Sequence, residues 1–131
     1  MKTSVLLILL ILSFACAALA VSVSFSIKWD APTTNADGTP LDDLSHYQFY
    51  VCDSVIQDDK TCQGAMSTFD VPKDQLTSAV DYQSTSRNGT VFVRGSALDT
   101  SNNESDLSNQ IAFEFSDQSP PNTITIQIVL P

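Results

Sequence analysis

The sequence has few basic residues, few glycines and a single histidine. Its 131 residues include six Lys or Arg against fifteen Asp or Glu, which gives a formal net charge of −9, with one His and four Gly. Such an acidic surface repels nucleic-acid phosphates and anionic lipid headgroups, so we expect no nucleic-acid partner and no membrane contact once a leader is removed. The four glycines form neither a phosphate-binding loop nor a G-x-S-x-G motif.

Catalytic and metal-binding patterns are also missing. His46 follows Ser45, and adjacent strand residues normally point to opposite faces, so this pair predicts no triad. The acids of the 30–43 segment lack the spacing of a calcium loop and are interpreted as solvated charge. The pair Asp58 and Asp59 falls on a predicted loop, where nothing buries one carboxyl to raise its pKa. We therefore expect no enzyme, no metal and no cofactor.

The first twenty residues have the pattern of an export signal. Lys2 is positive, residues 5–12 are apolar, and Ala18 and Ala20 are small residues where a signal peptidase reads. Residues 1–20 are therefore predicted to be a signal peptide, which places the mature chain outside the cell or in a periplasm. One alternative is an uncleaved membrane anchor. The other is a lipoprotein anchored through Cys16, although Ser13 replaces the usual Leu.

Cysteine usage agrees with export. Three cysteines are present, and removal of Cys16 with the leader leaves Cys52 and Cys62 as a pair. In an oxidising compartment such a pair favours a disulfide, which would stabilise a loop of this size by about 2–3 kcal/mol. A metal site is the competing interpretation, but two Cys and one distant His supply too few ligands.

Alternating apolar residues predict several half-buried β-strands, because successive side chains of a strand face opposite sides. Residues 24–29, 47–51, 68–71, 91–97 and 111–115 have this pattern. Gly95, within the fourth segment, predicts a bulge or a close backbone approach. Residues 76–86 have no clear pattern, and no element is predicted there.

Several motifs identify a family resemblance over residues 24–115. They are W-D-A-P from Trp29, D-G-T-P-L from Asp37, A-L-D-T-S-N-N-E-S from Ala97, and S-N-Q-I from Ser108. Together they resemble a fibronectin type III domain of the bacterial style. The resemblance implies an all-β, immunoglobulin-like sandwich over residues 21–118, with core landmarks at Trp29, Tyr47, Phe49, Val93 and Ala97. One departure is Val91, which stands where relatives carry a corner tyrosine.

The C-terminal residues 119–131 are predicted to be a Pro-Pro linker followed by an extra strand. Its apolar positions alternate at Ile124, Ile126, Ile128 and Leu130. Only about four residues precede Phe25 after leader cleavage, so the sandwich lacks a first strand. The extra strand either replaces it within the same chain or enters a neighbouring copy by strand addition. The sequence is compatible with both arrangements.

The function predicted from this fold is a non-catalytic, secreted or cell-surface binding or adhesion module. Sandwich domains bind through end loops, here residues 32–44, 84–88 and 100–106. The candidate contact residues are Asn35, Asp37, Asp42, Arg87, Asn102 and Glu104, and the expected partner is a protein or a surface glycan. The alternative is a structural subunit that self-associates by donating its C-terminal strand. A polysaccharide-binding accessory is disfavoured, because these loops contain no aromatic residue.

Overall fold

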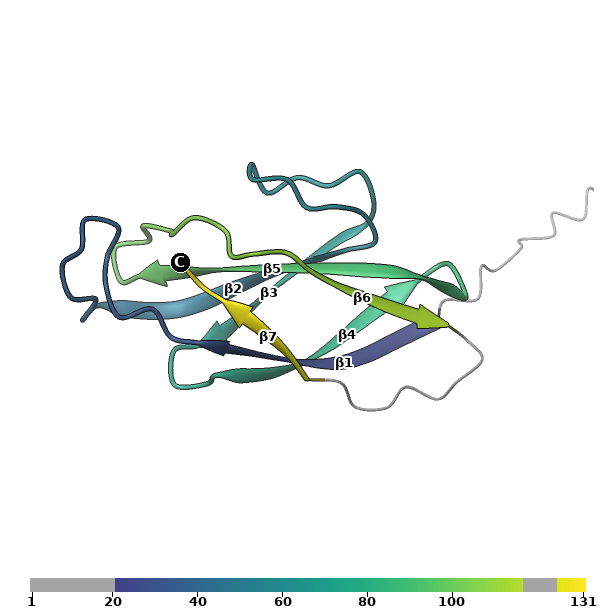
Figure 1. Ribbon diagram of the computed structural model, residues 1–131, viewed down its shortest axis with the longest axis horizontal. Helices are drawn as coiled ribbons and strands as arrows, with labels where there is room; N and C mark the ends of the chain where they lie inside the picture. The colour runs from purple at the N-terminus through teal and green to yellow at the C-terminus, as the bar shows by residue number, and fades with distance from the viewer. Residues whose placement is uncertain (1–20, 117–124) are drawn as a thin grey trace, which may run out of the picture.

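The structure is a computed structural model that describes residues 21–116 and 125–131. The described residues form seven β-strands and no helix (Figure 1). The predicted leader with Cys16, the linker and Ile124 lie outside the described residues. The strands are β1 (Val21–Asp30), β2 (Leu44–Cys52), β3 (Met66–Pro72), β4 (Thr77–Ser84), β5 (Asn88–Asp99), β6 (Ile111–Ser116) and β7 (Thr125–Val129). Because the described part contains no helix, none of it could cross a membrane in helical form.

The seven strands form two sheets, as expected for a β-sandwich. One sheet has the order β4-β1-β7 and the other the order β3-β2-β5-β6. Neighbouring strands are antiparallel, except that β7 runs parallel to β1. The all-β class predicted from the sequence is therefore confirmed at the level of two stacked sheets.

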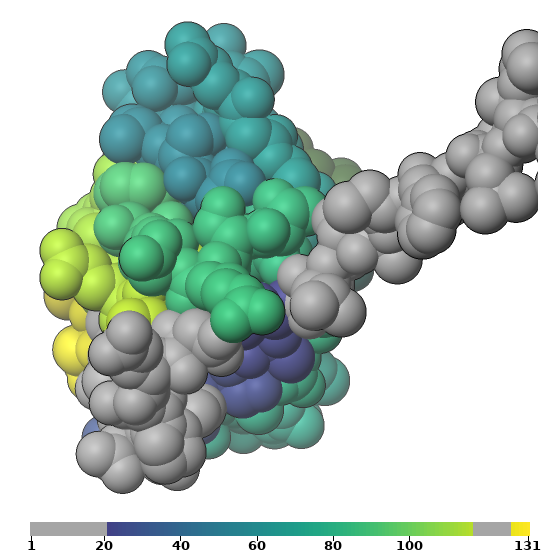
Figure 2. Space-filling view, turned by 90° about the vertical axis from the view of Figure 1, so that its right-hand side faces the viewer, coloured from purple at the N-terminus to yellow at the C-terminus, as the bar shows by residue number. Residues whose placement is uncertain are grey.

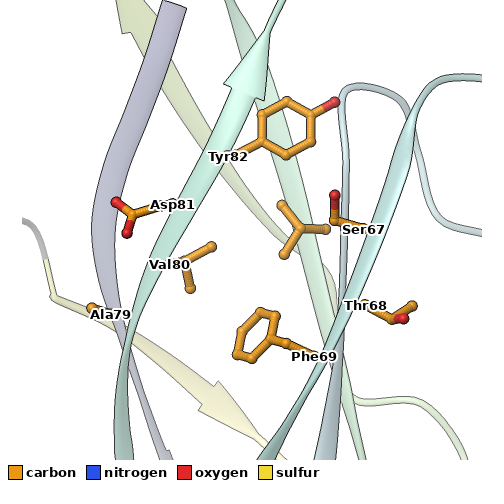
Figure 3. Close-up of a pocket in the computed structure, with 8 residues that line it drawn as sticks. Ser67, Thr68, Phe69, Ala79, Val80, Asp81 and Tyr82 are labelled. Carbon is orange, nitrogen blue, oxygen red and sulfur yellow. The ribbon is translucent and has the colours of Figure 1, made fainter.

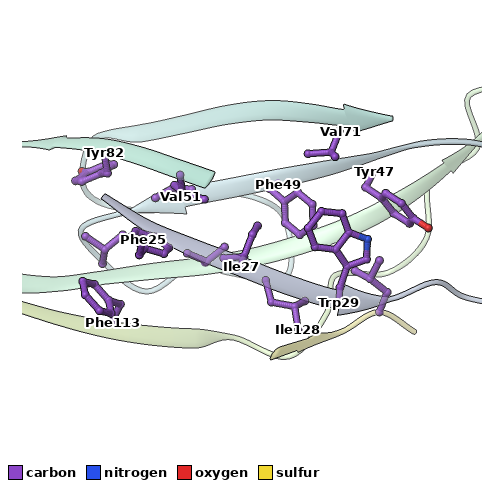
Figure 4. Close-up of a cluster of buried hydrophobic side chains, with 14 of the residues drawn as sticks. Phe25, Ile27, Trp29, Tyr47, Phe49, Val51, Val71, Tyr82, Phe113 and Ile128 are labelled. Carbon is purple, nitrogen blue, oxygen red and sulfur yellow. The ribbon is translucent and has the colours of Figure 1, made fainter. Parts of the chain in front are cut away.

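The core lies between the sheets and is built from the alternate residues that face inward. Trp29 lies against two rings of the opposite sheet, with ring centroids 5.3 Å from Tyr47 and 4.6 Å from Phe49 (Figure 4). All five residues expected as core landmarks are buried, from 0% to 5% exposed. Among the described residues, neither the indole N–H of Trp29 nor the hydroxyl of Tyr47 has a hydrogen-bond partner. Contacts between the three rings therefore add to the strand pairing at this end of the core.

Residues 76–86, where no element was predicted, contain β4, so that expectation was wrong. Val80 and Tyr82 are buried in alternation, and Val80 is paired with Phe25 of β1. Small and hydroxylated residues around these two positions dilute the apolar pattern in the sequence. The register with β1 fixes the strand instead, as tertiary context often does for weak patterns.

The C-terminal strand pairs within its own chain. Ile126 is aligned with Ile27 and Ile128 with Trp29, and both Ile128 and Leu130 are buried. Of the two arrangements expected from the sequence, the structure has the intrachain one. β7 therefore occupies a place beside β1 in the three-stranded sheet (Figure 1).

Gly95 marks a close approach rather than a bulge. It pairs with Phe49 in an unbroken register. A Cβ atom at this position would lie 2.5 Å from Phe49 Cε1 and 3.3 Å from Leu130 Cδ2. The absence of a side chain therefore makes room for the Phe49 ring and for the residue that follows β7.

Candidate functional site

Three loops of the protein share one turn geometry. In residues 35–39, 57–61 and 99–103 the first amide N–H donates to the fifth carbonyl, and the fourth N–H donates to the first carbonyl, over 2.7–3.1 Å. The fourth residue has a positive φ each time: 84° at Gly38, 64° at Lys60 and 62° at Asn102. This is the three-residue hairpin loop in which a type I turn is followed by a left-handed residue. This repeated geometry was not predicted from the sequence, although the first two loops share an Asp-x-Thr pattern.

Aspartate side chains rigidify these turns. Asp37 Oδ1 accepts hydrogen bonds from the Thr39 hydroxyl at 2.6 Å and from the Thr39 backbone N–H at 3.0 Å. Asp59 bonds Thr61 in the same way. The bond from the Thr39 side chain, followed by that from its backbone, lowers the pKa of Asp37. These carboxylates therefore cap the turns in their ionised form.

In the third turn, residues 99–103, the capping carboxylate belongs to the first residue, Asp99. Asp99 accepts hydrogen bonds from the backbone N–H groups of Ser101 and Asn103 and from the Asn103 side chain, at 2.7–2.8 Å. The bond from the Asn103 side chain, followed by that from its backbone, lowers the pKa of Asp99. Asn102 at the turn tip is exposed.

Two of these turns lie at one end of the sandwich. The β1–β2 loop (residues 31–43), the β3–β4 loop (73–76) and the β5–β6 loop (100–110) are together at the left in Figure 1 and form what we call the loop end. The Thr100 N–H donates to the Asp43 carbonyl at 2.9 Å, which joins the first and third loops. Neither of these two loops contains Lys or Arg. Asp37 and Asp42 are exposed, whereas Asn35 is half-buried and bonded to Thr39 and Pro40.

Arg87 and residues 84–88 do not belong to the loop end, so their grouping with the other two loops was wrong. β4 runs antiparallel to β1, and the connection from β4 to β5 therefore lies at the opposite end. Figure 2 views that end, where the connection lies below the loop that follows β2. This misplacement of residues 84–88 follows from the failure to predict β4. Each strand carries the chain from one end of the sandwich to the other, so overlooking one strand assigns the next loop to the wrong end.

Glu104 is also placed differently from expectation. It was predicted as a contact residue, but its carboxylate accepts hydrogen bonds from Ser96 at 2.6 Å and from Tyr50 at 2.8 Å, and it pairs with Lys60. Burial tends to raise the pKa of Glu104, but the bonds from Lys60, Ser96 and Tyr50 outweigh burial and lower this pKa. Burial, followed by the bond to Glu104 and its charge, raises the pKa of Tyr50 to about 12. Glu104 thus joins the β5–β6 loop to the β2–β3 connection and to strands β2 and β5.

The predicted disulfide between Cys52 and Cys62 is present and closes the connection between β2 and β3. This disulfide loop, residues 53–65, packs Ile56 against Tyr50 and Cys52 on the outer side of the four-stranded sheet. Arg94 fixes it further, through bonds of 2.7 Å to Asp58 and 3.2 Å to the Ile56 carbonyl. The signal missed in the sequence was Tyr50, an outward-facing aromatic two residues before a cysteine.

Ser45 and His46 do interact, contrary to the prediction from strand alternation. His46 Nδ1 lies 3.1 Å from Ser45 Oγ. The register between β2 and β5 shifts between Leu44 and His46, so Ser45 is the extra residue of a bulge and its side chain can reach its neighbour. Ser45 is the only hydrogen-bond partner of the His46 side chain among the described residues. The carboxylate that would orient a catalytic histidine has no counterpart there.

The described ranges, 21–116 and 125–131, contain no group of three His, Cys, Asp or Glu side chains arranged to hold a metal ion. No protein-family model, curated protein or solved structure matches the chain.

Proposed function

We propose that this protein is an exported, non-catalytic binding module of the fibronectin type III kind, which engages a partner through its loop end. The observation that carries the proposal is the joined pair of capped turns, 35–39 and 99–103, held by the bond from Thr100 to Asp43. A binding surface is effective when its loops are ordered before contact, since little conformational entropy is then lost on association. The disulfide is compatible with an extracellular or periplasmic location.

The charge of the loop end favours a cationic partner. Residues 31–43 and 99–110 carry Asp37, Asp42, Asp43, Asp99, Glu104 and Asp106 and no basic residue, and the third loop of this end, residues 73–76, adds one residue of each sign, Lys73 and Asp74. Glu104 is neutralised by Lys60, while Asp37 and Asp42 remain exposed. Complementary charge mainly accelerates association and excludes wrong partners. We therefore favour a basic patch on a protein surface over an uncharged glycan.

Site-specific photocrosslinking tests the proposal. A photoreactive residue at Ala36 or at Ser101, both exposed in the two turns, is expected to give the same adduct when the protein is added to its native cell surface. The adduct should weaken with added salt and in an Asp42→Lys variant. A matched control carries the photoreactive residue at Gln83, which is exposed on β4 away from the loop end. Adducts formed only at Gln83 would show that another face binds.

Self-assembly by donation of the C-terminal strand receives no support from the geometry. Ile128 and Leu130 are already buried in their own chain, and the edge of β1 that a donated strand would occupy is taken by β7. The same surface cannot hold two strands at once.

A further inference from the structure

The two flanks of the sandwich differ in how they are closed. On one flank β7 bridges the sheets, because the Val129 N–H bonds Asn109 Oδ1 at 3.0 Å and Leu130 packs near Gly95. On the other flank β3 ends one sheet and β4 ends the other. A cavity of about 330 Å³ lies between β3 and β4, with Phe69, Val80 and Tyr82 pointing toward it (Figure 3).

Inward-facing positions of β3 are incompletely covered at this flank. Val71, Phe69 and Ser67 all face the core, since they pair with Tyr47, Phe49 and Val51 of β2. Val71 is buried and Phe69 half-buried, whereas Ser67 is exposed. The cover over the core therefore decreases along β3 toward the disulfide loop. The floor of the cavity is apolar, with Val51, Val80 and Tyr82 buried.

The free edge of β3 has little protection against another strand. Edge strands usually carry lysine, an internal proline or a bulge, which discourages pairing. In Met66–Pro72 there is no lysine, the proline is the last residue, and the register with β2 is unbroken. Among the described strands β3 pairs only with β2. Its outer backbone groups therefore form a template for strand addition.

The two strands that border this flank carry charge of one sign, and the loop between them adds one residue of each sign, Lys73 and Asp74. β3 and β4 contain Asp70 and Asp81, both exposed, and no Lys or Arg. A third carboxylate, Asp53, lies near Tyr82, where burial and then the charge of Asp53 raise the pKa of the Tyr82 phenol. A second copy of this chain is a poor occupant, because six basic residues are set against fifteen acidic ones.

We propose that the β3–β4 flank binds an extended segment of a partner protein in which apolar residues alternate with Lys or Arg. The segment adds to the edge of β3. Its apolar side chains cover Phe69 and fill the cavity beside Val80, and its basic side chains, on the opposite face, lie across from Asp70. Cross-strand pairs of opposite charge stabilise such an arrangement. This site is separate from the loop end and does not depend on the function proposed for it.

Fluorescence anisotropy with defined peptides tests this site. The probe is a fluorescein-labelled peptide of alternating valine and lysine, added to the secreted protein with its disulfide formed. We expect it to bind at least about tenfold more tightly than a peptide of alternating valine and glutamate, because charge complementarity discriminates between them. Backbone N-methylation of the probe should abolish binding, since strand addition needs its N–H groups.

Variants of the protein locate the contact. Asp70→Lys should weaken binding by about tenfold, whereas Asp42→Lys makes the same charge change at the loop end and should alter it little. Ser67→Trp should block the cavity. If that variant does not fold, Asp70→Lys still decides the outcome. Slower amide exchange of β3 in the complex would support the site. Equal weakening by Asp42→Lys, or protection confined to residues 31–43, would overturn it.

Discussion

At the scale of single residues, Gly38 shows what the shared turn requires. Its φ of 84° lies in the left-handed region, and no atom lies within 4 Å of the position a Cβ would take. Gly38→Ala therefore introduces backbone strain without a clash and should lower the free energy of unfolding by about 1 kcal/mol. Urea denaturation measures this loss.

The control for Gly38 is supplied by the third turn, where Asn102 has a φ of 62° at the equivalent position. Asparagine tolerates this conformation better than alanine, so Gly38→Asn should cost less than Gly38→Ala. Equal losses for the two variants would mean that the turn conformation is not what the glycine provides.

Glu104 gives the molecule a pH dependence whose sign can be worked out. Its pKa is lowered in the folded protein from the usual 4.5, so the unfolded chain binds a proton more readily. The stabilisation is therefore present above pH 4.5 and is lost as the pH falls through the folded value. Glu104→Gln should reduce the free energy of unfolding by about 1–2 kcal/mol near neutral pH, through loss of charged hydrogen bonds.

The difference between the Glu104→Gln variant and the wild-type protein should shrink in urea denaturation well below pH 4.5. Glu114 is exposed on β6, so Glu114→Gln serves as the matched control and should have little effect at either pH. A Glu104→Gln loss that is independent of pH would show that shape, and not charge, matters at this position.

At the scale of elements, the disulfide loop is the part most dependent on a single bond. The combined variant Cys52→Ala and Cys62→Ala should lose about 2–3 kcal/mol of unfolding free energy, because the unfolded chain regains the entropy of an open loop. Hydrogen exchange should accelerate mainly in residues 53–65, since pairing with β5 still holds β2 on its other side. Acceleration throughout both sheets would mean that this bond maintains the whole fold.

The sequence predicted the elements whose apolar residues alternate without interruption. Phe25, Ile27 and Trp29 in β1 are large residues with polar neighbours, and Tyr47, Phe49 and Val51 recur at the same spacing in β2; each set is buried as expected. β4 could not be recognised from the sequence, because Val80 and Tyr82 are its only large inward-facing residues. It forms a strand because it pairs with β1.

The candidate site was predictable only in part, for a related reason. The turn residues of 35–39 and 99–103 indicated loops, but the end to which each loop belongs depends on the number of strands before it. Missing β4 therefore misplaced Arg87. The structural role of Glu104 depends on Lys60 and Tyr50, which are distant in sequence and meet it only after the disulfide loop folds onto the sheet.

At the scale of the whole molecule, β7 decides whether the sandwich is complete. A chain ending at Ser119 lacks Ile128, which is fully buried, and Leu130, which is buried beside Gly95. Loss of two buried aliphatic side chains should cost at least about 3 kcal/mol of unfolding free energy. Size-exclusion chromatography with light scattering should find the full chain monomeric over a wide concentration range, because its apolar strand is satisfied internally.

Point variants separate the role of β7 from general effects of truncation. Ile128→Ser should approach the cost of the truncation, whereas Val129→Ser, on the next residue and 59% exposed, should change stability by less than about 0.5 kcal/mol. Oligomers that grow with concentration and disappear on truncation would contradict the intrachain pairing. Such a result would make strand donation between copies the better account, because the same apolar strand would then be buried in a neighbour.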